Sequence, residues 1–236
     1  MIFIPKRDIK TAPNLNLTLN GSRIIQVHSA KFLGVIIDDS LNWKDHIQSI
    51  YSNLLKYISL FYKIRNILPM HIMKNIYYAT VHPKLLYGIE VYANTCQTYL
   101  DNLIIRNNKI LRVAQSKPFD TPTLSLYTEY NTLPIDILFK YNSLLLAHKI
   151  SHHAHLLPNV FANYFLINKD VHSHDTRSKD LVHLPQYNKN IGHRNFKYLG
   201  GSLWNAIPKE LKDIIRINLF KKSIKTYLLR LLQNIT

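Results

Sequence analysis

The feature that most constrains the fold of this sequence is a change of hydrophobic periodicity within residues 31–46, KFLGVIIDDSLNWKDH. Before this stretch, apolar residues alternate with polar ones, which is typical of half-buried β-strands. From Leu41 onward, apolar residues recur every three or four positions, which is typical of amphipathic helices. The sequence therefore predicts an α+β fold that is predominantly α, with a short β segment followed by helices.

The β segment contains a strong hairpin signal. Apolar residues within 15–19 and 24–27 flank Asn20-Gly21, and this dipeptide tolerates the positive φ angles of a type I′ turn. Residues 32–37 predict a third strand, in which Gly34 permits a close backbone approach or a bulge. We therefore expect a small three-stranded arrangement ahead of the first helix.

Helical periodicity and capping residues predict the rest of the chain. The first helix begins near Leu41, with Ser40 or Asn42 as its cap, and ends by Pro69. Further helices are expected over residues 70–81, 99–115, from 123, from 132 to about 150, over 196–207, from 208 and from 218. This pattern favours three parts, which are residues 1–40, a helical bundle at 41–116, and a basic region at 117–236 with an irregular loop at 151–192.

The charge of the chain favours a polyanionic partner. Lys and Arg number 30 against 14 Asp and Glu, so the formal net charge is +16. Nucleic acid is the first candidate and an anionic membrane surface the second. The ordinary alternative is that the charge only keeps the surface solvated.

Other sequence features bear on the cellular compartment. Charged residues such as Lys63, Lys84 and Lys140 interrupt every apolar run that could span a bilayer. The N-terminus lacks the apolar core of a secretory signal, and the single Cys96 allows no internal disulfide. We expect an intracellular protein, nuclear or cytoplasmic and not secreted, with neither a membrane partner nor a small-molecule substrate.

Asp38 and Asp39 follow an apolar strand, as do the paired aspartates that hold two catalytic metal ions in polymerases. Such a site needs a further carboxylate from another strand, and the only acidic residue upstream is Asp8. The favoured interpretation is that the two carboxylates belong to the turn and to the start of the helix, where the helix dipole attracts negative charge.

The histidines suggest a metal site only weakly. His152, His153 and His155 form one cluster, and His172 and His174 form another. No Cys-x-x-Cys or His-Glu-x-x-His motif closes a site around them, so a polar loop is the favoured interpretation. The sequence also lacks a nucleophile elbow and a phosphate-binding glycine loop. It therefore predicts no catalytic residue and no metal ligand.

The C-terminal region is rich in basic residues, and its only acidic ones from position 189 onward are Glu210 and Asp213. Its basic residues are Lys189, Arg194, Lys197, Lys209, Lys212, Arg216, Lys221, Lys222, Lys225 and Arg230. Tyr198 and Trp204 lie among them, as in surfaces that stack nucleic-acid bases. The helical spacing of Trp204 with its apolar neighbours favours a core position instead.

Several motifs together resemble the reverse transcriptases of non-LTR retrotransposons, the LINE-type and jockey-like elements. They are KFLGVIID followed by LNWKDHI, then IYYATVHPKLLYG at 76–88, HDTR at 174–177 and LWNAIP at 203–208. Each motif is weak alone, but their order over residues 31–225 is fairly specific. The resemblance is to the C-terminal part of such an enzyme, namely the primer grip, the thumb and the region that follows.

The resemblance implies roles for particular residues. Residues 1–40 would be a palm remnant in which Phe32, Leu33 and Gly34 form the primer grip, and residues 41–116 would be the thumb. The partner implied is an RNA–DNA or RNA duplex, bound through basic residues of the thumb helices. The residues expected to contact it are Lys44, Lys56, Lys63, Arg106, Lys109 and Arg112.

The resemblance also implies what the chain lacks. The catalytic palm motifs are missing, so we expect no polymerase activity from this chain alone and no cofactor in it, since Mg²⁺ would be bound by the missing palm. The missing polymerase portion is a second expected partner. Three alternatives stay open: a degenerate element relic, a reused protein-interaction scaffold, and an unaided polymerase that uses Asp38 and Asp39.

Overall fold

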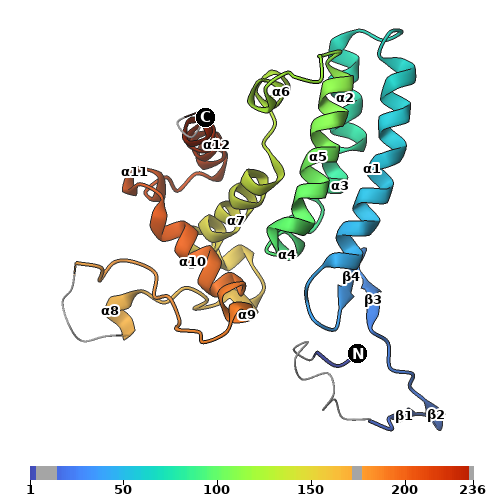
Figure 1. Cartoon of the computed structure of the whole chain (residues 1–236). Coiled ribbons are helices and arrows are strands. Elements are labelled where there is room, and N and C mark those ends of the chain that lie inside the picture. Colours follow the sequence, from blue (N-terminus) through green and yellow to red (C-terminus); the bar gives the residue numbers. More distant parts are fainter. Residues whose placement is uncertain (4–14, 172–176, 234–236) are drawn as a thin grey trace. The chain divides into compact units, whose positions relative to one another are not determined.

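The computed structural model describes residues 1–3, 15–171 and 177–233 (Figure 1). Its contacts divide the chain into two compact units, Met1–Leu126 and Tyr127–Thr236. Helices dominate both units, and the described strands are short and lie near the N-terminus. The predicted α+β fold, mostly α, is confirmed. The division at residues 40 and 116 stays a prediction about function.

The first hairpin was predicted correctly from its turn. Strand β1 (Thr18–Leu19) pairs antiparallel with β2 (Ser22–Arg23). Asn20 and Gly21 between them have φ angles of 49° and 77°, the signs that a type I′ turn requires. Both strands are only two residues long and exposed, so this hairpin buries almost none of its side chains against the rest of the unit.

The predicted single strand over residues 32–37 is wrong. The chain instead forms a second hairpin, in which β3 (Ser29–Phe32) pairs with β4 (Val35–Asp38). The turn between them is Leu33-Gly34, with φ angles of 45° and 83°. Gly34 adopts this conformation without strain, whereas Leu33 needs support from elsewhere in the fold. The result is two separate two-stranded sheets in place of one three-stranded arrangement.

The helices of the first unit lie close to their predicted positions. They are α1 (Lys44–Ile64), α2 (Met70–Thr80), α3 (His82–Leu86), α4 (Ile89–Tyr92) and α5 (Gln97–Ala114). Helices α1 and α5 pack along each other (Figure 1), and Leu54, Phe61 and Leu103 are fully buried in this unit. Tyr62 lies at the edge of the apolar stripe of α1 and is 47% exposed.

Two buried tyrosine hydroxyls of this core have hydrogen-bond partners. The Tyr77 hydroxyl donates a hydrogen bond to Asn107 Oδ1 at 3.0 Å and thereby links α2 to α5. The Tyr92 hydroxyl donates to the Leu85 carbonyl at 2.5 Å. Burial raises the pKa of Tyr92, so this hydroxyl stays protonated and remains a donor. Buried tyrosines therefore contribute both packing and orientation in the helical bundle.

The second unit is built around α7 (Ile135–His152), which packs against α10 (Phe196–Ala206) and α12 (Ile217–Gln233). Ahead of α7, helix α6 (Thr123–Tyr130) begins at the predicted residue and spans the boundary between the units. Phe220, Ile224 and Leu228 form the buried face of α12. Leu231 has the same helical spacing but is 41% exposed, because the apolar contacts end one turn earlier.

Among its described residues, the region predicted to be irregular contains short elements, namely η2 (Ala154–Leu156), η3 (Asn159–Phe161), α8 (Asn168–Val171) and α9 (Asn190–His193). Later in the chain, α11 (Lys209–Lys212) lies between α10 and α12. A β-bridge pairs Ile167 with Val182. Across the part of the chain that the structure describes, every helix is too short or too polar to cross a membrane.

Candidate nucleic-acid interface

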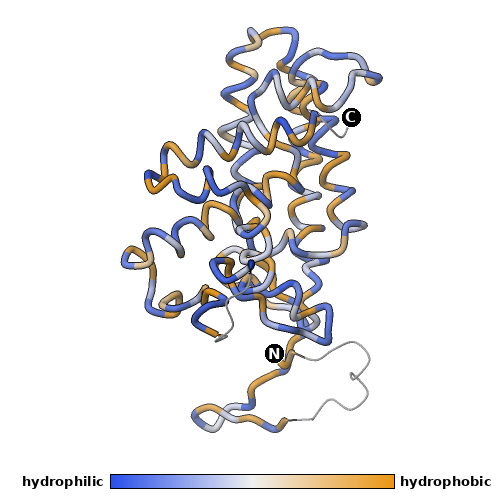
Figure 2. The backbone as a smooth tube through the Cα atoms, turned by 90° about the vertical axis from the view of Figure 1, so that its left-hand side faces the viewer, coloured by the Kyte–Doolittle hydropathy of each residue, from blue (hydrophilic) through white to orange (hydrophobic). Residues whose placement is uncertain are grey.

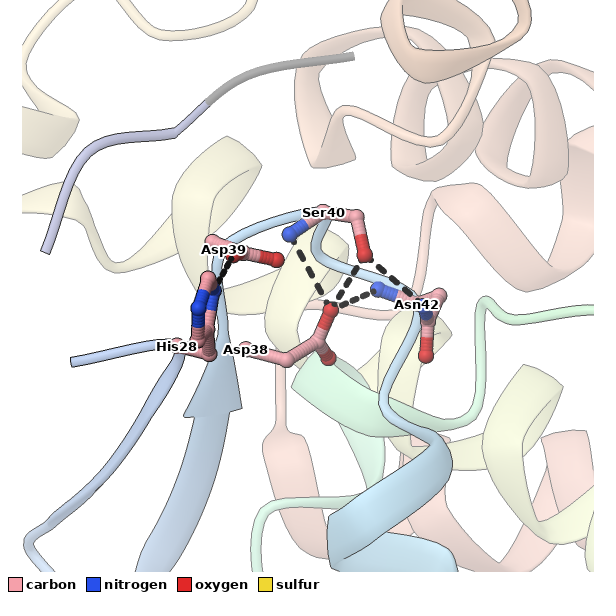
Figure 3. Close-up of polar contacts among 5 residues, drawn as sticks. All are labelled: His28, Asp38, Asp39, Ser40 and Asn42. Carbon is pink, nitrogen blue, oxygen red and sulfur yellow. Dashed lines mark hydrogen bonds and ion pairs between the residues drawn. The ribbon is translucent and has the colours of Figure 1, made fainter. Parts of the chain in front are cut away.

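Asp38 organises the joint between β4 and α1 (Figure 3). Its Oδ1 accepts hydrogen bonds from the backbone N–H groups of Ser40 and Asn42, both at 3.1 Å, and from the Ser40 hydroxyl at 2.8 Å. Its Oδ2 accepts the N–H of Trp43 at 2.7 Å. Leu41 and Trp43 both have positive φ angles in this turn, and the carboxylate holds the backbone in that conformation.

The surroundings of Asp38 do not fit a catalytic metal. Burial alone would raise the pKa of this carboxyl, but the hydrogen bonds from Asn42, Ser40 and Trp43 outweigh it and lower the pKa below 3.8. The neighbouring Asp39 turns away and lies 2.8 Å from His28 Nδ1 (Figure 3). Four donors already surround the Asp38 carboxylate, so it holds a turn together, as the favoured interpretation stated.

The predicted primer-grip residues form the exposed tip of the β3–β4 hairpin. Phe32 and Leu33 are 63% and 75% exposed. Tyr87, which follows α3, donates its hydroxyl to the Leu33 carbonyl at 2.5 Å, and a Cβ added to Gly34 would lie 3.1 Å from the Tyr87 ring. Tyr87 thus supports the positive φ of Leu33 and fixes the tip against the helices.

The three predicted lysines of α1 are all exposed but do not share one face. Lys56 and Lys63 are seven residues apart, which rotates them by only about 20° on an α-helix, whereas Lys44 lies about 120° away from Lys56. Lys56 and Lys63 therefore present one common cationic face, and Lys44 lies near the joint with β4.

The predicted residues of α5 differ in their availability. Lys109 is exposed. Arg106 donates from Nε to the Tyr51 hydroxyl on α1 at 2.9 Å, and Arg112 donates to the Thr121 carbonyl at 3.1 Å. Both arginines are half-buried, so part of their hydrogen-bonding capacity already holds the first unit together.

Sequence reasoning did not propose two further lysines beside the predicted primer-grip turn as contact residues. Lys31 on β3 and Lys84 on α3 line a pocket of about 520 Å³ together with Tyr57 and Tyr87. Both lysines lie within motifs that carried the resemblance, and this was the sequence feature that could have identified them. Their common pocket could not be inferred, because it depends on how β3, α1 and α3 pack.

Histidines at the C-terminal end of α7, including His153 directly after it, contact backbone carbonyls in the second unit. Nε2 atoms of His148, His152 and His153 lie 2.7, 2.8 and 2.9 Å from the carbonyl oxygens of Ile214, Lys212 and Ile215. Within the described residues, no group of three His, Cys, Asp or Glu side chains is placed to hold a metal ion. His172 and His174 lie outside those residues. The α7 histidines thus fix the segment that leads into α12.

Trp204 is part of the core of the second unit, as its helical spacing indicated. It is only 6% exposed, and its ring lies edge-on to His148 and His152, with centroids 6.2 and 6.0 Å away. It also forms part of the wall of a cavity of about 730 Å³. Tyr198 is half-buried and contacts His193.

Two buried imidazoles make stability depend on pH. Burial lowers the pKa of His46, which accepts the Ile36 N–H on Nδ1, and of His148 below 6.5. As the pH falls below 6.5, the unfolded chain takes up protons that the folded chain does not, so we expect the free energy of unfolding to decrease between pH 7 and 5.

Urea denaturation followed by Trp43 fluorescence in a Trp204→Phe background would measure this effect in the first unit. His46→Asn keeps an acceptor for the Ile36 N–H and cannot be protonated in this range, so its unfolding free energy should vary less with pH. An equally steep pH dependence in His46→Asn would contradict the assignment.

Comparison with known proteins gives the chain its relatives. It is 32% identical over 106 residues to the RNA-directed DNA polymerase from mobile element jockey of Drosophila funebris, and 32% identical over 107 residues to that of Drosophila melanogaster. Each match covers 44% of this chain and 12% of the relative, so the chain spans a small part of these proteins. No protein-family model and no solved structure matches it. The chain is thus similar to jockey-type mobile-element polymerases, and the predicted resemblance to the reverse transcriptases of non-LTR retrotransposons is confirmed.

Proposed function

We propose that this chain binds the template–primer duplex as part of a mobile-element polymerase, and that it does not catalyse polymerisation by itself. The observation that carries the proposal is the exposed hairpin tip at Phe32 and Leu33, which Tyr87 anchors to the helices. The tip belongs to the same unit as the cationic face of α1, and the chain is similar to jockey polymerases. Lys56 and Lys63 would contact the backbone phosphates of an RNA–DNA or RNA duplex. Thumb helices contact the backbone and the shape of a duplex, so binding would tolerate changes in the nucleotide sequence of the duplex.

A second partner is proposed for the N-terminal β segment, namely the polymerase portion that carries the catalytic motifs and binds Mg²⁺. Figure 2 shows apolar stretches along the chain near the N-terminus, outside the helices. Several large apolar side chains here are 42–81% exposed, namely Leu15, Leu17, Leu19, Ile24, Ile25 and Val27. Such a run of exposed apolar residues is typical of a surface that another protein segment covers.

Duplex binding is tested by fluorescence anisotropy with a labelled RNA–DNA hybrid at increasing salt. We expect binding that weakens steeply as salt rises, because each phosphate contact releases a counterion and adds about 0.9 to the slope of log affinity against log salt. Unrelated duplex sequences should bind equally well. Absence of binding at low salt, or binding that salt does not weaken, would contradict the proposal and leave the protein-interaction scaffold as the better interpretation.

A further inference from the structure

The pocket beside the primer-grip turn has the composition of an anion site. It lies in the first unit and is lined by residues of β3, α1, α2 and α3. Its two charged residues are Lys31 and Lys84, and no Asp or Glu lines it. Both lysines are exposed, and neither has an ion pair or side-chain hydrogen bond among the described residues. The pocket is therefore a cationic hollow with no internal counter-charge.

Polar and aromatic side chains complete the pocket wall. Asn53 and Tyr57 face it from α1, and Tyr87 closes the side next to the hairpin tip. A volume of about 520 Å³ is within the range of sites that hold molecules of nucleotide size. Tyrosine rings provide surfaces on which a base or a sugar can pack while a phosphate remains near the lysines.

The pocket also adjoins the cationic face of α1. Lys56 is three residues after Asn53, which lines the pocket, and residues three apart are neighbours on a helix surface. A strand that follows Lys63 and Lys56 along α1 would therefore reach the pocket next. At the other end of the pocket, Tyr87 contacts the Leu33 carbonyl and leads to the hairpin tip.

We propose that this pocket binds one nucleotide unit of a nucleic-acid strand, with its phosphate between Lys31 and Lys84 and its sugar or base against Tyr57. This proposal rests on the proposed function. It specifies the point at which the bound strand passes from α1 to the hairpin tip. Charge complementarity favours a phosphate-bearing strand over an apolar peptide. The same phosphate chemistry could come from a free nucleotide, and the experiment separates the two sources.

The test uses a variant that fills the pocket without changing charge. Ala79 is exposed on α2 and lines the pocket, so Ala79→Trp would occupy it with little disturbance of the core. We expect this variant to bind the labelled RNA–DNA hybrid about tenfold more weakly than the wild type, with about the same salt slope. The double variant Lys31→Gln, Lys84→Gln should also bind more weakly and lose about 1 to 2 from the salt slope.

The matched control is Lys140→Gln, Lys149→Gln. It removes the same charge from two exposed lysines of α7 and should retain most of the wild-type affinity. Far-UV circular dichroism and thermal melting confirm that each variant is folded. If both pocket variants bind the hybrid as tightly as the control while the wild type binds normally, the pocket assignment is wrong and the proposed function stands. If the wild type itself does not bind, both are wrong.

Competition separates the two phosphate sources. We expect millimolar inorganic phosphate or adenosine monophosphate to displace little of the hybrid, because a strand has additional contacts along α1. If either small molecule binds tightly to the wild type and not to Ala79→Trp, while the hybrid binds equally to both, the pocket takes free nucleotides. That result would overturn the strand assignment.

Discussion

Asp38→Ala is expected to lower the unfolding free energy of the first unit by about 3 kcal/mol. The substitution removes the acceptor for three backbone N–H groups and one hydroxyl, and the joint turn contains two non-glycine residues with positive φ. An unsatisfied buried donor costs about 1–3 kcal/mol, and partial access of water to this turn reduces the sum.

Urea denaturation of Asp38→Ala, followed by Trp43 fluorescence in a Trp204→Phe background, would measure this loss. Asp38→Asn keeps one carbonyl oxygen of similar shape and should lose less, and Asp39→Ala, whose partner is the exposed His28, should change stability by under about 0.5 kcal/mol. Equal effects of Asp38→Ala and Asp39→Ala would contradict the role of Asp38 in the joint. Metal-dependent primer extension by the wild type, lost in both variants, would instead support the catalytic alternative.

The double charge reversal Lys56→Glu, Lys63→Glu is expected to weaken binding of an RNA–DNA hybrid by at least about tenfold and to lower the salt slope by about 2. The two side chains share one face of α1, so one duplex can contact both. Charge reversal replaces two phosphate contacts with electrostatic repulsion of the phosphates. Neither residue is buried, so the stability of the fold should change little. Anisotropy titrations over a range of salt concentrations would measure affinity and slope together.

The control for this reversal is Lys140→Glu, Lys149→Glu on α7, which changes the net charge by the same amount. Its affinity loss should be much smaller, because general charge repulsion is screened within about 10 Å at 0.1 M salt. If the two double variants lose affinity equally, then α1 makes no specific contact with the duplex. The cationic face of α1 would then only add to the overall charge of the chain.

Prediction from the sequence succeeded where the signal is local. The Asn20-Gly21 turn, the extents of α2 and α7, and the buried stripe of α12 all follow from residues within a few positions of one another. The predicted strand over residues 32–37 was wrong because the conformation there depends on a residue distant in sequence. Leu33 belongs to an apolar run and favours a strand, but Tyr87, 54 residues away, stabilises it in a turn.

The sequence suggested residues for the candidate interface but not how those residues are arranged. The motifs correctly indicated similarity to a jockey-type polymerase, and the spacing of Lys56 and Lys63 alone shows that they share a face. The sequence did not indicate that Arg106 donates to Tyr51 or that Arg112 donates to Thr121. The first contact joins two helices that are distant in sequence, and the second depends on a sharp turn of the chain.

The sequence by itself determined the mostly helical architecture and the first hairpin turn, because periodicity and turn residues record local backbone preferences. Its motifs also carried the resemblance to mobile-element polymerases. Only the tertiary structure decided that Tyr87 holds the Leu33-Gly34 turn and that Lys31 and Lys84 share one pocket. Both outcomes depend on where the chain reverses direction and which helices then meet. Such positions are set by packing across the whole unit, and a linear pattern of residue types does not contain them.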